Sequence, residues 1–196
     1  MADAARSPRD RMVYSAAQLV RERGVTATGV RDVVDRAAAP RGSFQHYFPG
    51  GKDQLVSEAL LWSGDFAAQW VASYVDGARR PTPSGLFTHM VSQWKREFST
   101  RGFERGCPVN AAAADLVGGD SPVNAPLREA LTRWEDAIVA ALFRMGIPTR
   151  RGRRLATLML SSMEGAILLS RLHGSVQPLT TVAAGLGPLL DRAHRG

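Results

Sequence analysis

The chain has 196 residues, enough to bury a sizeable core in one or two domains. Its 44% hydrophobic and 22% charged residues are ordinary for a soluble globular protein, and its single cysteine excludes an intramolecular disulfide framework. The formal net charge of +7 suits an anionic partner such as DNA, although all but two of the 25 basic residues are arginines, which a GC-rich genome also produces.

Three short helices are predicted at the start of the chain. The first runs from about Pro8 to Gly24, and the second follows Thr28, whose side chain suits an N-cap. The third begins at Pro40, because proline has no amide proton to leave unsatisfied in a first turn, and it ends at residues 49–51. A very short turn joins the second and third helices, which is typical of a helix-turn-helix that places its last helix in the major groove of DNA.

The remainder of the chain is also predicted to be helical, which makes the fold all-α with about nine helices. Apolar residues recur at helical spacing over 52–76, 87–98, 127–142 and 155–172, and a short helix follows Cys107. Ser84 is predicted to cap the helix over 87–98. Pro188 is predicted to kink or shorten the last helix, because its ring clashes with the preceding turn.

The third predicted helix combines inward aromatic residues with outward polar ones. Phe44 and Phe48 are expected to point into the core and to fix the helix. The outward residues that can donate hydrogen bonds to phosphates or bases are Arg41, Ser43, Gln45, His46 and Tyr47. Gly42 lets the backbone approach DNA, and Lys52 stands at the start of the next helix, where a phosphate can bind.

The segments from Thr28 to Ala37 and from Arg41 to Leu55 resemble the DNA-binding signature of the TetR/AcrR family of bacterial repressors. The doubled glycine before Lys52, the run 105–109 and the run 163–166 are similar to the LmrA/YxaF-like subgroup. The resemblance implies a helix-turn-helix DNA-binding domain over residues 1–51. It also implies a helical ligand-binding and dimerisation domain over residues 52–196.

The resemblance also assigns roles to individual residues of the reading helix. It implies that Tyr47 and Lys52 contact phosphates. It places a second group nearer the bases, namely Arg41, Ser43 and Gln45, with Thr28, Gly42 and His46 in the same DNA-binding set. The chain departs from the family in two places: residues 38–40 read Ala-Ala-Pro where Gly-Val-Ser is usual, and Gln45 stands where tyrosine is frequent.

Aromatic and sulfur-containing side chains suggest a pocket for a hydrophobic small molecule in the second domain, because such pockets are mostly apolar with a few polar anchors. The predicted lining residues are Trp62, Phe66, Trp70, Met90, Trp94, Phe98, Cys107, Asn110, Trp134 and Met163. Asn110, Asp115 and Glu164 are the candidate anchors. The alternative is that the apolar residues only fill the core. Cys107 is interpreted as a buried structural thiol, and a redox sensor is the alternative reading.

The helix over 155–172 is apolar nearly all round, so a second copy of the chain is expected to cover one of its faces. The predicted dimer interface consists of Leu168, Leu172, Leu179, Val182, Leu186 and Leu189. The alternative is a monomer in which this helix is thoroughly buried. The arginine run over 150–154 is interpreted as a solvated helix start rather than a DNA contact.

No motif in the chain favours an enzyme, a metal site or a cofactor. The four histidines are scattered without metal-ligand spacing, and residues 50–53 lack the remaining positions of a phosphate-binding loop. No membrane span or signal peptide is recognised, so a cytoplasmic protein is expected. The sequence thus favours a homodimeric repressor that releases a palindromic DNA operator when a hydrophobic small-molecule inducer binds. The alternative is a helical small-molecule- or partner-binding protein without a transcriptional role, and an activator stays open as well.

Overall fold

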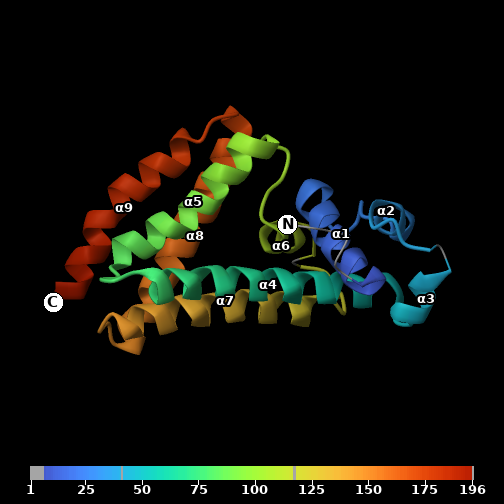
Figure 1. Ribbon diagram of the computed structural model, residues 1–196, viewed down its shortest axis with the longest axis horizontal. Helices are drawn as coiled ribbons and strands as arrows, with labels where there is room; N and C mark the ends of the chain where they lie inside the picture. Colours follow the sequence, from blue (N-terminus) through green and yellow to red (C-terminus); the bar gives the residue numbers. More distant parts are fainter. Residues whose placement is uncertain (1–6, 41, 117, 196) are drawn as a thin grey trace. The chain divides into compact units, whose positions relative to one another are not determined.

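The computed structural model describes residues 7–40, 42–116 and 118–195, with side chains up to residue 192. Within these residues the chain forms nine α-helices and no β-strand, which confirms the predicted all-α class. The helices are α1 (Pro8–Arg23), α2 (Val30–Arg36), α3 (Ser43–Tyr47), α4 (Gly51–Gly77), α5 (Pro83–Arg101), α6 (Pro108–Leu116), α7 (Asn124–Arg144), α8 (Thr149–His173) and α9 (Gln177–Arg195) (Figure 1). They form two compact units, and the division falls inside α4 and α7.

The first unit contains the described residues up to Asp65 together with Cys107–Leu131. Ser7 caps α1, because its Oγ accepts a hydrogen bond from the backbone N–H of Asp10 at 3.1 Å. The helix ends at Gly24, whose backbone φ of 83° is rarely adopted by residues that have a side chain. One apolar core joins α1, α2, Phe48 and the start of α4. It is formed by Met12, Val13, Ala16, Ala17, Leu19, Val33, Val34, Ala37, Phe48, Leu55 and Ala59.

Helix α6 belongs to the first unit, although it comes after α5 in the sequence. It packs against α1, and its Asp115 approaches the loop that follows α1. The boundaries of the two compact units therefore differ from the predicted boundary between a DNA-binding domain and a ligand-binding domain at residues 51 and 52. That domain boundary stays a prediction.

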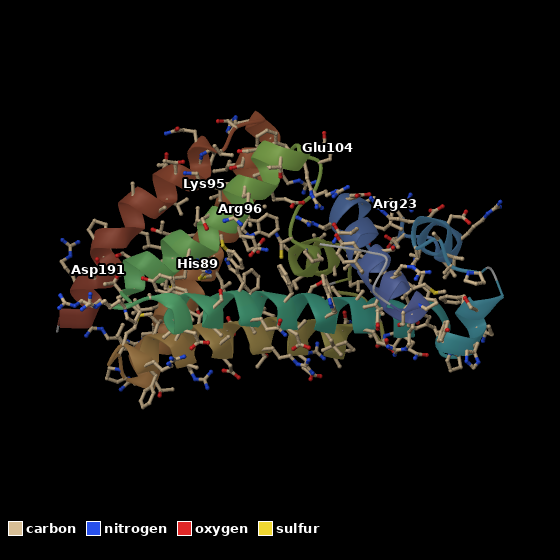
Figure 2. The ribbon with its side chains drawn as sticks, in the orientation of Figure 1. Arg23, His89, Lys95, Arg96, Glu104 and Asp191 are labelled. Carbon is tan, nitrogen blue, oxygen red and sulfur yellow. The ribbon has the colours of Figure 1, made fainter. Side chains whose placement is uncertain are left out.

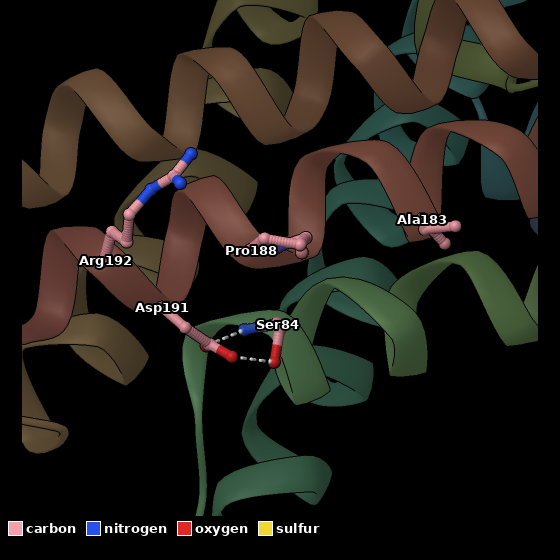
Figure 3. A pocket seen from close by; sticks show the side chains of 7 residues that line it. Ser84, Ala183, Pro188, Asp191 and Arg192 are labelled. Atoms are coloured by element: carbon pink, nitrogen blue, oxygen red, sulfur yellow. Dashed lines mark hydrogen bonds between the residues drawn. The ribbon is translucent and has the colours of Figure 1, made fainter.

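The second unit contains Phe66–Gly106 and the described residues from Thr132 onward. Here α9 packs along both α5 and α8. The carboxylate of Asp191 on α9 accepts two hydrogen bonds from Ser84 on α5, one from its backbone N–H at 3.0 Å and one from its hydroxyl at 2.8 Å (Figure 3). A groove of about 460 Å³ lies beside this pair on α9. These two hydrogen bonds thus hold the first turn of α5 against α9.

Three of the predicted helix ends were wrong. The N-cap of α2 is Gly29 rather than Thr28, because the Thr28 hydroxyl donates to the carbonyl of Gly24 at 2.6 Å instead. The N-cap of α5 is Thr82 rather than Ser84, which binds Asp191. Helix α3 begins at Ser43, three residues after Pro40, so the proline lies in the preceding turn.

Two further expectations were wrong in part. Helix α9 continues through Pro188 to Arg195, so the proline does not shorten the helix, and the kink stays a prediction. Leu131, one of the apolar residues at helical spacing over 127–142, lies on α7 and is 39% exposed. By length and composition α8 could cross a membrane, and in the described part of the chain it is the one helix that meets this test; core helices of soluble proteins meet it too.

Candidate nucleic-acid interface

Helices α2 and α3 form a helix-turn-helix on the core of the first unit. Val33, Val34 and Ala37 hold α2 in that core. Phe48 is fully buried directly after α3, and its ring lies 5.5 Å from the ring of Phe44. Because these side chains fix the inner side of α3, the orientation of its outer side is determined by packing within the first unit.

The turn before α3 contains an unusual backbone conformation at Ala38. Its φ is 47°, the left-handed region in which a Cβ is unfavourable. The amide of Ala39 donates to the carbonyl of Val34 at 3.1 Å, and the hydroxyl of Ser43 donates to the carbonyl of Pro40 at 2.6 Å. These contacts close the turn before α3. The N-cap residue of α3 is Gly42, which has no side chain to cap the helix.

The outer side of α3 carries Gln45 and His46, which are exposed as predicted. Ser43 and Tyr47, also predicted to face outward, are half-buried, and Tyr47 packs against the core of the first unit. Gly42 has open space where a Cβ would lie, so the backbone can approach a partner closely at this point. The arrangement offers amide, imidazole and hydroxyl groups of the kind that bind bases and phosphates.

Lys52 lies in the first turn of α4 and is half-buried. Its Nζ donates to the carbonyl of Thr26 at 3.2 Å, in the loop between α1 and α2. Thr28, also predicted to contact DNA, is only 1% exposed, so its side chain does not face a partner in this structure. Arg41, predicted to lie near the bases, falls outside the described residues.

One candidate residue was missed in the sequence. Arg31 lies on the outer side of α2, its side chain is 82% exposed, and its Nε is 3.9 Å from a carboxylate oxygen of Asp35. Both residues line a groove of about 570 Å³ beside Phe44 of α3. Helical spacing gives part of the signal, since Arg31 falls on the side of α2 opposite the buried Val33. Other arginines nearby are paired: Arg36 forms two hydrogen bonds with Glu22, at 2.7 and 2.8 Å.

The residues of the predicted ligand pocket divide between the two units. Met90, Trp94, Phe98, Trp134 and Met163 are buried in the second unit, where the Trp94 and Phe98 rings lie 5.9 Å apart. The remaining residues of that unit are less enclosed: Trp70 is half-buried and Phe66 is 44% exposed. The first unit contains half-buried Trp62, buried Cys107 and exposed Asn110. The two grooves described above are lined by none of these residues, so the pocket stays a prediction.

The predicted dimer residues also differ in exposure. Leu168, Leu172 and Leu189 are at least half exposed, and Val182 is half-buried. Leu179 and Leu186 are buried inside the second unit, so their side chains do not face a partner.

Comparison with known proteins agrees with this architecture. The family model described as bacterial regulatory proteins, tetR family, matches residues 14–59. The model of the transcriptional regulator LmrA/YxaF-like C-terminal domain matches residues 83–185. An uncharacterised HTH-type transcriptional regulator of Mycobacterium tuberculosis, Rv0196, is 38% identical over 190 residues, which is 93% of this chain and 94% of that relative.

More distant relatives share the same extent. The HTH-type transcriptional regulator LmrA of Bacillus subtilis is 26% identical and covers 94% of this chain and 97% of its own. A TetR transcriptional regulator from Legionella pneumophila has the same fold, with a TM-score of 0.81 over 95% of this chain and 99% of the other, at 16% identity. The chain belongs to the TetR family of transcriptional regulators, and its C-terminal domain is of the LmrA/YxaF-like type.

Proposed function

We propose that the protein is a ligand-responsive homodimeric repressor in the cytoplasm, without enzyme activity or cofactor. It binds a palindromic DNA operator and releases that operator when a hydrophobic small molecule binds. The observation that carries the DNA-binding part is the outer side of α3, where Gln45 and His46 are exposed while buried Phe48 fixes the helix from within.

A dimer is needed to read a palindrome, because two reading helices must enter successive major grooves about 34–36 Å apart. An exposed apolar face on α8 and α9 supports such a dimer. It is formed by Leu158, Leu168, Leu169, Leu172 and Leu189, all at least 41% exposed. Large leucines exposed together on two packed helices are unusual for a monomer, and a second copy of the same face would cover them.

The ligand is proposed to bind among the aromatic side chains of the second unit. Half-buried Trp70 stacks on the ring of His89 there, which places an imidazole among the aromatic side chains. Ligand binding would shift the population toward a dimer whose reading helices no longer fit the operator. A hundredfold loss of DNA affinity corresponds to a coupling free energy of about 2.7 kcal/mol, within the usual allosteric range.

The DNA-binding part is tested by fluorescence anisotropy on the DNA upstream of the protein's own gene, at moderate salt. We expect specific binding to a palindromic segment and weaker binding to a scrambled segment of the same length. Equal affinity for both would contradict operator recognition. A hydrophobic compound found by thermal shift should then release the specific complex; one that tightens it would contradict induction.

The dimer is tested by sedimentation velocity of Leu172→Glu and Leu168→Glu. Both should produce monomers, because each buries a carboxylate in the proposed interface. Phe143→Glu is the matched control: Phe143 is an exposed large apolar residue on α7, at 63%, outside the proposed face. A monomeric wild-type chain, or Leu172→Glu that dimerises as the wild type does, would contradict the interface.

A further inference from the structure

The loop between α1 and α2 is held by a residue from a distant part of the sequence. Oδ2 of Asp115, in the last turn of α6, accepts a hydrogen bond from the backbone N–H of Thr26 at 2.6 Å. Gly24 passes so close to this carboxylate that a Cβ there would lie 3.0 Å from Oδ2. The acid thus contacts the loop at two points, both within the first unit.

The same peptide also holds the predicted phosphate contact. The carbonyl of Thr26 accepts the hydrogen bond from Nζ of Lys52 at 3.2 Å, while its N–H donates to Asp115. Thr26 therefore joins a carboxylate from α6 to an ammonium group from α4. The hydrogen bond from Thr26 lowers the pKa of Asp115 below its usual value, and the charge of Lys52 lowers it further, so the acid is ionised at neutral pH.

We propose that Asp115 is a positioning residue for DNA binding, because its carboxylate holds the loop over residues 24–29 and, through Thr26, keeps Lys52 where a DNA phosphate can reach it. The inference rests on the proposed function, since it assumes that Lys52 contacts phosphate. It makes α6 part of the DNA-binding machinery, a role outside the helix-turn-helix itself. Without the acceptor oxygen, the loop would occupy additional conformations, and the apparent affinity would fall with the fraction that remains competent.

Asp115 also contributes a negative charge near the DNA. That charge opposes phosphate binding, whereas the hydrogen bond favours it, so two substitutions are needed to separate them. Asp115→Asn keeps an oxygen acceptor and removes the charge. Asp115→Ala removes both. The difference between these two variants isolates the hydrogen bond, and Asp120→Asn, at an exposed acid in the same unit, controls for loss of a negative charge elsewhere.

The experiment measures affinity for the upstream DNA by anisotropy over a range of salt concentrations. Asp115→Ala should bind about three- to tenfold more weakly than Asp115→Asn, the range expected for loss of one hydrogen bond. Its plot of log affinity against log salt should also be shallower by roughly one phosphate contact, as in Lys52→Met, whereas Asp115→Asn should keep the slope of the wild type. A general loss of stability in Asp115→Ala would lower the affinity without making the salt dependence shallower, so the two effects together indicate a lost phosphate contact.

Amide hydrogen exchange of the full-length protein without DNA gives an independent measure. The Thr26 amide should exchange faster in Asp115→Ala than in Asp115→Asn or Asp120→Asn, while amides in the centre of α1 stay protected in all three. Equal affinities and slopes for the two Asp115 variants, or equal exchange at Thr26, would overturn the inference. A wild-type chain that binds no DNA would instead overturn the proposed function, and with it the role of Lys52.

Discussion

The side chains of Trp70 and His89 each form a hydrogen bond with the backbone carbonyl of the other residue. Nε1 of Trp70 donates to the carbonyl of His89 at 3.2 Å, and Nε2 of His89 lies 3.1 Å from the carbonyl of Trp70, so this nitrogen carries the proton. The two rings stack with centroids 4.3 Å apart, and the guanidinium of Arg96 lies over Trp70 at 5.9 Å. His89 and Arg96 both come from α5 (Figure 2), whereas Trp70 comes from α4. The contact between Trp70 and His89 therefore joins α5 to α4.

This pair predicts a pH-dependent stability. Burial lowers the pKa of the His89 imidazole below 6.5; the hydrogen bond to the carbonyl of Trp70 raises it in part, and the charge of Arg96 lowers it again. The unfolded chain therefore binds a proton on this ring more readily than the folded one. Stability from the neutral ring is fully present above about pH 6.5 and is lost as the pH falls through the folded pKa. His89→Gln, which keeps an amide donor, should show a smaller loss of unfolding free energy between about pH 7 and pH 5.

Urea unfolding at several pH values measures this difference. His173→Gln, at the exposed end of α8, is the matched control and should retain the pH dependence of the wild type. If His89→Gln and the wild type lose stability in parallel on acidification, His89 does not contribute as described.

A close helix crossing in the first unit predicts a severe effect at Gly64. A Cβ at this position of α4 would lie 2.6 Å from the carbonyl oxygen of Ala130 on α7. Since the clash is with backbone, no side-chain rotation relieves it, and Gly64→Ala should lower the unfolding free energy by about 2 kcal/mol or more. Gly77→Ala at the end of α4, where a Cβ meets nothing within 4 Å, should be neutral or gain up to about 1 kcal/mol from helix propensity. Thermal unfolding of the two variants measures the difference. A Gly64→Ala chain as stable as Gly77→Ala would mean that α4 and α7 do not approach this closely.

The turn of the helix-turn-helix contains a position where the sequence opposes the conformation. Ala38 has a φ of 47°, which costs a residue with a Cβ about 1–2 kcal/mol, partly offset because glycine loses more entropy on folding. Ala38→Gly should therefore raise the unfolding free energy by about 0.5–1 kcal/mol. Ala39→Gly, next to it at a negative φ, should lower that free energy instead. Denaturant titration would reveal the opposite signs, and a loss of stability in Ala38→Gly would contradict the strain.

Local sequence patterns predicted the positions of the helices better than the residues that cap them. Helical spacing and chain-breaking residues located the helices well: Pro8 and Gly24 bound α1 as predicted. Caps were less predictable, because Ser84 and Thr28 each found another hydrogen-bond partner in the folded chain.

At the candidate site, too, local sequence patterns predicted only part of the arrangement. Inward Phe48 and outward Gln45 follow from periodicity, which depends on neighbouring residues alone. The contact of Asp115 with Thr26 joins residues 89 positions apart, and no local pattern encodes such a contact. Likewise, spacing did not distinguish exposed Leu168 from buried Leu179, since each is apolar and only the packed unit decides which side is covered.

The proposed roles on and beside α3 predict two different responses to salt and sequence. Lys52→Met and Tyr47→Phe remove groups assigned to phosphates, so they should weaken binding to all DNA sequences, and Lys52→Met should reduce the salt slope by roughly one. Gln45→Ala removes an exposed amide assigned to a base edge, so it should cost about 1–3 kcal/mol on the operator and relax the preference for one base pair. Anisotropy on the operator, a scrambled duplex and single-base variants measures both effects. A Gln45→Ala variant that loses affinity equally for operator and scrambled DNA would place Gln45 on the phosphates rather than the bases, because only a base contact carries sequence information.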